Sequence, residues 1–171
     1  YNETDGVAIL PTPTIGAVGL ITHPDQIIGT DIRKNHVALV LGKTTGHLGQ
    51  SALLSVHSNS CEGDAPPVDL ALEKAHGDFI RAHHAHISAC TDLGDGGLAL
   101  AAFELAETTG IGITLDASDT PTLFGEDQAR YLIACTSDQA ETLITEAARS
   151  GLSLSIVGKF GGPDVSFGGA S

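Results

Sequence analysis

The sequence predicts an α/β fold in which helices cover a mixed β-sheet. Short apolar runs of strand length alternate with longer segments of helical periodicity, and their irregular alternation favours a mixed sheet over a purely parallel one. Of the 171 residues, 42% are hydrophobic and 17% charged, which suits one domain with an ordinary core. Aromatic residues make up only 4%, so we expect a core of Ala, Leu, Ile and Val.

The expected strands are apolar runs bounded by turn residues. The first follows Pro11 and Pro13, and the run 37–41 is continuously apolar, as buried strands are. The predicted strands span residues 15–22, 37–41, 87–90, 111–115, 131–135 and 152–157.

The expected helices are marked by start signals and by apolar spacing. Pro66 and Pro67 suit a first helical turn, and Val68, Leu72, Ala75 and Phe79 then follow on one face. Thr136 and Gln139 resemble a capping box, and Gly151 suits the position after the helix that follows. The predicted helices span residues 50–57, from 66 to about 79, 98–107 and from about 137 to 150, with residues 98, 101, 102 and 105 facing the sheet.

The charge balance excludes several classes of partner. Eight Lys and Arg against 21 Asp and Glu give a net charge of −13. Neither non-specific nucleic-acid binding nor an anionic membrane surface suits so few, scattered basic residues. No stretch of 18 apolar residues is present, so no membrane span is predicted.

Cysteine and histidine usage indicates no metal or disulfide framework. Three widely spaced cysteines form no C-x-x-C pair, which favours a reducing, cytoplasmic setting. His76, His83, His84 and His86 cluster in the sequence, but neighbours on a helix diverge, so a solvated helix end is expected rather than a zinc site.

The turn from Asp92 to Leu98 is the sharpest candidate for a ligand site. An apolar strand leads into a glycine-rich turn and a helix follows, which directs unpaired N–H groups to one place. Gly96 and Gly97 would let a ligand approach, and Asp92 and Asp95 would require a metal or a metal-bound phosphate such as one held by Mg²⁺. The alternative is a tight turn in which Asp95 caps the helix.

Three other patterns permit competing interpretations. Gly94-x-Gly96-x-x-Ala99 with Asp116 has the spacing of a nicotinamide dinucleotide-binding site. Gly42-Lys43-Thr44 lacks the earlier glycine of a phosphate-binding loop and is interpreted as a polar strand end. The polar side chains of the segment 125–130 permit two interpretations: they hydrogen-bond a ligand, or they pair with one another, for example as an ion pair of Glu126 with Arg130.

Several motifs together resemble phosphoribosylformylglycinamidine synthase, in its synthetase subunit. They occur in family order and cover nearly the whole chain. The motifs are Tyr1 to Thr4, Pro11 to Gly19, Leu48 to Ser51, Asp92 to Leu98, Phe124 to Arg130 and Val157 to Lys159.

The resemblance implies a three-layer α/β/α domain with a mixed sheet, similar to the C-terminal domain of aminoimidazole ribonucleotide synthetase. Residues 1–171 would form one C-terminal-type domain of a longer chain, with 1–10 as the tail of the preceding domain. The family converts formylglycinamide ribonucleotide to its amidine with ATP, Mg²⁺ and ammonia. Its partners are the rest of the subunit, a glutaminase subunit and a small bridging subunit.

The resemblance also implies that this chain holds no catalytic residue and instead carries an auxiliary site by internal pseudo-symmetry. Its residues would be Asp95, Gly96, Gly97, Glu126, Asp127 and Gln128, with Asp92 as metal ligand. Two departures weaken such a phosphate site: Gly94 stands where the family turn has Ser, and Asp127 where the family has Ser.

Overall fold

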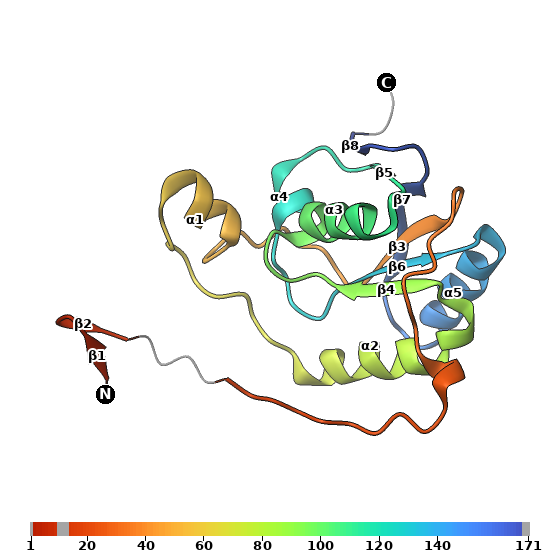
Figure 1. Cartoon of the computed structure of the whole chain (residues 1–171), viewed down its shortest axis with the longest axis horizontal. Coiled ribbons are helices and arrows are strands. Elements are labelled where there is room, and N and C mark those ends of the chain that lie inside the picture. Colours follow the sequence, from red (N-terminus) through yellow and green to blue (C-terminus); the bar gives the residue numbers. More distant parts are fainter. Residues whose placement is uncertain (1, 10–13, 169–171) are drawn as a thin grey trace.

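A computed structural model describes residues 2–9 and 14–168, and in it six strands form one mixed sheet (Figure 1). The strands are β3 (Val37–Leu41), β4 (Ala89–Asp92), β5 (Ile113–Leu115), β6 (Tyr131–Cys135), β7 (Leu154–Phe160) and β8 (Val165–Phe167). Their order is β4-β6-β3-β7-β5-β8, antiparallel except for the parallel pair β5–β8. The predicted mixed sheet is therefore confirmed.

Helices cover both faces of this sheet, which gives the three-layer α/β/α arrangement (Figure 1). α3 (Gly97–Thr109) packs on one face with the short α4 (Thr120–Phe124), and α2 (Leu70–Ala82) and α5 (Ser137–Arg149) pack on the other. β3 separates two cores, because Ala38 and Val40 belong to the first and Leu39 and Leu41 to the second.

The helices follow their local signals. Thr136 and Gln139 form the predicted capping box, and Gly151 has a φ of 71° just beyond α5. The α3 residues Leu98, Ala101, Ala102 and Leu105 are buried, as their spacing predicts. α2 begins later than expected, at an Asp69 cap whose side chain accepts from the N–H groups of Ala71 and Leu72, and this leaves Val68 exposed.

The strand predicted at residues 15–22 is not formed. Residues 14–22 are extended and exposed and have no strand partner in the described part of the chain, while Pro11 and Pro13 lie outside it. Before them, β1 (Glu3–Thr4) and β2 (Val7–Ala8) form a hairpin apart from the main sheet (Figure 1). The short strand β8, helix α4 and this hairpin were not predicted, because runs this short carry no measurable periodicity.

Two short 3₁₀ helices, η1 (Pro24–Gln26) and η2 (His84–His86), and helix α1 (Ala52–Ser58) complete the described structure. None of the helices in residues 2–9 and 14–168 has the length and apolar character to cross a bilayer.

Candidate functional site

The glycine-rich turn after β4 and the segment 125–130 meet at one end of the sheet, although they are thirty residues apart in the sequence. The main contact is the Glu126 carboxylate, whose Oε1 accepts from the backbone N–H of Gly96 at 2.8 Å. The same oxygen accepts from the N–H of Ala52, the first residue of α1, also at 2.8 Å. One side chain thus joins the starts of two helices, where a negative charge is favourable.

Two of the N–H groups expected to be free for a ligand, those of Gly96 and Gly97, are bonded within the chain. Gly96 donates to Glu126, and Gly97 donates to the carbonyl oxygen of Gly94 at 3.0 Å. The two glycines also face protein, since a Cβ on Gly97 would lie 2.5 Å from the Gly125 oxygen and one on Gly96 2.7 Å from the Leu100 Cβ. Their φ angles of +75° and +61° give a conformational reason for glycine at both positions.

Asp127 organises the loop that follows β3. Its Oδ2 accepts from the N–H groups of Thr45 and Gly46, each at 3.0 Å, and its Oδ1 accepts from the Thr45 hydroxyl. Burial by itself would raise the pKa of Asp127, but these hydrogen bonds and the charge of Arg130 outweigh it and lower the pKa below its usual value. The carboxylate is therefore ionised and engaged.

Arg130 is the most deeply buried charge of the described residues, and its guanidinium has three internal acceptors. Nε donates to the Asp127 carbonyl at 3.1 Å, Nη1 donates to the Thr44 hydroxyl at 3.1 Å, and Nη2 donates to the Gly125 carbonyl. Burial lowers the pKa of Arg130, while the charges of Asp127 and Glu126 oppose that shift. The segment 125–130 does pair internally, but with another partner than the example given: Arg130 Nη1 lies 3.9 Å from Asp127 Oδ2 and forms its ion pair with Asp127 rather than with Glu126.

His76 is a further buried group that the sequence did not reveal. The expectation of a solvated helix end fails for it, because α2 turns it inward, where Nδ1 lies 2.6 Å from the carbonyl oxygen of Ala129 and Nε2 has no partner. Ala129 has a φ of 57°, which is unusual for a residue with a side chain. His83, His84 and His86 lie at or beyond the end of α2, and no group of three metal-ligating side chains occurs among the described residues.

Several of the remaining candidate site residues lie around a small hollow beside the turn. It has a volume of about 190 Å³, and Asp92, Gly94, Gln128 and Glu73 lie in its wall. Asp92 and Gln128 are exposed. A Cβ on Gly94 would meet only one atom within 4 Å, Asp92 Oδ2 at 3.7 Å, so the space beside this glycine is open. One or two carboxylates beside phosphate oxygens is the usual set for Mg²⁺, and Asp92 and Glu73 are the two carboxylates in this wall. Asp95 is exposed on the same turn.

The nicotinamide interpretation is wrong. A dinucleotide site needs a strand, a helix and a second strand that lies parallel beside the first. The strand after α3 is β5, and β6, β3 and β7 separate it from β4. Asp116 therefore lies far along the sheet from the glycine-rich turn, and the match to the motif is coincidental.

Comparison with known sequences identifies a family and its relatives. The family described as "AIR synthase related protein, C-terminal domain" matches residues 34–168. The chain is 71% identical over 171 residues to phosphoribosylformylglycinamidine synthase subunit PurL of Roseobacter denitrificans, and 64% identical over 170 residues to that of Ruegeria pomeroyi. These alignments cover 100% and 99% of this chain and 24% of each relative, so the chain spans about a quarter of their length.

Solved structures have the same fold. PurL of Thermotoga maritima complexed with FGAR matches with a TM-score of 0.68 at 17% identity, over 84% of this chain and 27% of the other. The hydrogenase maturation protein HypE of E. coli matches with a TM-score of 0.61 at 17% identity, over 82% of this chain and 49% of the other.

Proposed function

The chain belongs to the family of AIR synthase related proteins, as the C-terminal domain, and from this we propose that it is part of a phosphoribosylformylglycinamidine synthase. The observation that carries the proposal is the 71% identity to a PurL subunit over all 171 residues. The full polypeptide would phosphorylate the formyl amide oxygen of formylglycinamide ribonucleotide with ATP. Ammonia would then displace phosphate and leave the amidine.

The partners of this reaction are part of the proposal. We infer that ATP and Mg²⁺ are the cofactors, and that ammonia comes from a glutaminase subunit through a complex that includes a small bridging subunit. T. maritima PurL, which has the same fold, is described in complex with ATP and in a PurLQS assembly. Those descriptions support the proposal for the longer polypeptide, of which this chain is one domain.

The catalytic groups are proposed to lie outside this chain. Glu126 and Asp127, which the family resemblance places in a site, are engaged with backbone groups, and Asp127 also pairs with the buried Arg130. Catalysis needs groups that can change partners with the substrate, and these have no such freedom. Their proposed role is to hold the glycine-rich turn against the loop after β3.

The reaction is tested with the full-length polypeptide, ammonium chloride, ATP and formylglycinamide ribonucleotide. We expect amidine formation that depends on both ATP and Mg²⁺, and none from residues 1–171 alone. If the full polypeptide forms no amidine when ammonium replaces glutamine, the proposal fails. If residues 1–171 alone form it, the assignment of catalysis to other domains is wrong.

An auxiliary site for a metal-bound phosphate is proposed in the 190 Å³ hollow, with Asp92 as the metal ligand and Gln128 and Glu73 beside it. Asp95, Gly96, Gly97, Glu126 and Asp127 would support its wall. The net charge is −13, and Arg130, the cationic residue that lines the hollow, has its guanidinium bonded to internal acceptors. The affinity is therefore expected to be poor, with a Kd for ADP of about 1 mM.

Amide chemical shifts during an ADP titration test the auxiliary site. We expect Mg²⁺-dependent shifts at Asp92 to Gly94 and Gln128, abolished by Asp92→Asn. Asp116→Asn is the control, because Asp116 is also exposed but follows β5, which β6, β3 and β7 separate from β4. Shifts that persist with a chelator, or that are lost with Asp116→Asn, would count against the site.

A further inference from the structure

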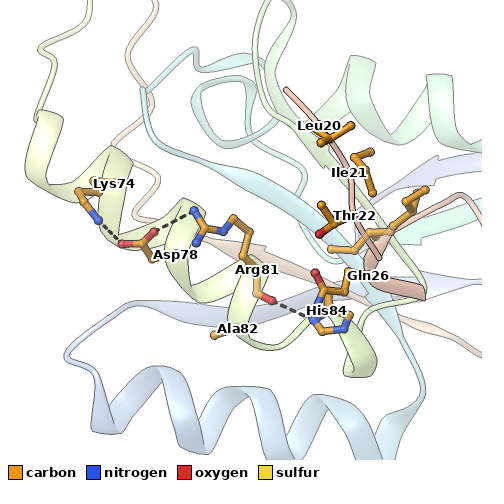
Figure 2. A pocket seen from close by; sticks show the side chains of 11 residues that line it. Leu20, Ile21, Thr22, Gln26, Lys74, Asp78, Arg81, Ala82 and His84 are labelled. Carbon is orange, nitrogen blue, oxygen red and sulfur yellow. Dashed lines mark hydrogen bonds and ion pairs between the residues drawn. The ribbon is translucent and has the colours of Figure 1, made fainter. Parts of the chain in front are cut away.

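His76 places an imidazole ring in the apolar face of α2. The outer face of this helix carries ion pairs, in which Asp78 contacts Lys74 and, at 3.5 Å, Arg81 (Figure 2). His76 lies instead on the inner face with Phe79, which belongs to the second core, and it is only 1% exposed. A polar ring is costly to bury without a hydrogen bond, so its partner carries information about why histidine stands at this position.

The partner is a carbonyl group that the backbone turns toward the ring. His76 Nδ1 lies 2.6 Å from the carbonyl oxygen of Ala129, 53 residues further along the chain. A carbonyl oxygen can only accept, so the ring nitrogen that faces it carries the hydrogen and donates. Nε2 has no partner among the described residues, and the ring therefore depends on the single bond from Nδ1.

Two unusual backbone conformations make room for this bond. Ala129 has a φ of 57°, and of the described residues that have a side chain and a positive φ it is the one whose side chain is apolar and cannot offset the cost by a local hydrogen bond. Gly42 has a φ of +107°, and a Cβ there would lie 2.7 Å from the Ala129 oxygen. Backbone strain of this kind persists only where the surroundings enforce it, and it is common at functional sites.

The peptide between Ala129 and Arg130 borders the hollow of about 190 Å³ described above. Both residues line the hollow, and Gln128 lies in its wall directly before them. The carbonyl oxygen of Arg130 accepts from the N–H of Leu93 at 2.9 Å. That bond holds the residue directly after Asp92, the proposed metal ligand, which also lines the hollow.

Helix α2 contributes to the same hollow. Glu73 lies in its wall, one turn before His76 on the helix. The bond from His76 to Ala129 therefore joins two parts of the wall that are far apart in the sequence. Apolar packing is non-directional, whereas a hydrogen bond requires one orientation of the carbonyl group, so this bond determines how the two parts of the wall are arranged.

We propose that His76 is a positioning residue for this hollow. Its Nδ1–H holds the Ala129 carbonyl in place and thereby keeps Gln128, Asp92 and Glu73 around one site. His76 is not among the residues that line the hollow, so it acts through the backbone. The consequence for ligand binding rests on the proposed auxiliary site, whereas the arrangement of the wall does not.

Two variants of similar shape separate the hydrogen bond from packing. His76→Asn keeps an N–H donor near the position of Nδ1, whereas His76→Leu has the same branching as asparagine but no donor. A role in packing alone predicts that leucine is tolerated better than asparagine at this buried position. A positioning role predicts the reverse order.

Hydrogen exchange of the full-length polypeptide, followed by mass spectrometry, measures that order. We expect His76→Leu to accelerate exchange of the Leu93 amide, whose acceptor is the Arg130 carbonyl, at least about tenfold, and His76→Asn to change it less than about twofold. The amides of β5 are the control region and should be unchanged in both variants, because β3 and β7 separate β5 from β4 and β6. Equal rates at Leu93 in the two variants, or faster exchange in His76→Asn, would overturn the proposal.

The wild-type protein provides a measurement that does not require His76→Leu to fold. In the full-length polypeptide labelled with ¹⁵N-histidine, the signals of His76 are identified by their loss in His76→Asn. They should show the hydrogen on Nδ1. A hydrogen on Nε2 and none on Nδ1 would overturn the proposal.

Addition of Mg²⁺ and ADP connects the bond to the hollow. The two together should slow exchange of the Leu93 amide in the wild type and in His76→Asn, but not in His76→Leu. Equal slowing in all three proteins would contradict the positioning role. If the wild type shows no slowing, the auxiliary site is refuted, and the rates without ligand still decide the role of His76, so the two proposals can fail separately.

Discussion

Single carboxylates at the end of the sheet hold together segments that are distant in the sequence. Glu126 satisfies two helix-start N–H groups and Asp127 satisfies two loop N–H groups. A hydrogen bond to a charged group contributes about 1.5–3 kcal/mol, more than the usual neutral bond. The residues that resemble a ligand site are therefore also the residues on which local stability depends.

The bridging role of Glu126 predicts a large effect of its removal. Glu126→Ala leaves the N–H groups of Ala52 and Gly96 without their acceptor and should lower the free energy of unfolding by about 2–4 kcal/mol. Glu126→Gln keeps an oxygen acceptor and should cost less than half as much. Urea unfolding measures both, with Glu104→Ala as control on the exposed side of α3. A loss below 1 kcal/mol for Glu126→Ala would show that the bridge is unimportant.

The lowered pKa of Asp127 predicts a stability that depends on pH. Because the folded state lowers this pKa below its usual value, the carboxylate stabilises the fold fully above pH 4 and loses this contribution as the pH falls through the folded pKa. Asp127→Asn cannot titrate at this position. The difference in stability between the two proteins, measured by thermal unfolding between pH 2.5 and 7, should be constant above about pH 5 and shrink below pH 4. A difference that grows on acidification would contradict the assigned sign.

At the scale of secondary-structure elements, the start of α3 is set by close packing against the segment before Glu126. Gly97 approaches the Gly125 carbonyl so closely that any side chain would collide with it, and Gly96 turns the chain with a positive φ. The turn therefore serves the junction between α3 and α4 as well as the neighbouring hollow.

A comparison of two glycines with similar backbone angles separates the stability cost of a steric collision from the cost of the left-handed conformation. Gly97 and Gly110 have φ angles of +61° and +66°, but a Cβ meets backbone only at Gly97. Gly110→Ala should cost about 1–2 kcal/mol, the penalty for the left-handed conformation. Gly97→Ala should cost at least about 1 kcal/mol more, since the collision is with backbone that cannot move freely. Equal losses in urea unfolding would show that the junction yields easily.

At the scale of the whole molecule, the sheet and its two helical layers shield two of the three thiols. Burial is the main cause that raises the pKa of Cys90 to about 12, with the charge of Asp92 adding to it, and burial raises that of Cys135 to about 11. Cys61 is exposed on the loop between α1 and α2.

Thiol reactivity reports whether this layering is intact. At pH 8 a disulfide reagent should modify Cys61 rapidly and the other two at least about 100-fold more slowly, since the thiolate is the reactive form. In denaturant all three should react. Cys61→Ser is the control and should leave no fast phase in the native protein. If Cys90 or Cys135 reacts rapidly in that variant, one of the helical layers opens readily.

Local patterns in the sequence determined most of the sheet and its helices. The apolar run at 37–41, the strand at 131–135 and the capping box before α5 each depend on residues that are neighbours in the chain. Only the tertiary structure decided which distant groups meet. Glu126 pairs with backbone 74 and 30 residues away, Arg130 selects Asp127, and His76 turns inward. The same limit explains residues 14–22: their apolar pattern predicted a strand, but a strand needs a neighbour to pair with, and none of the described residues pairs with them.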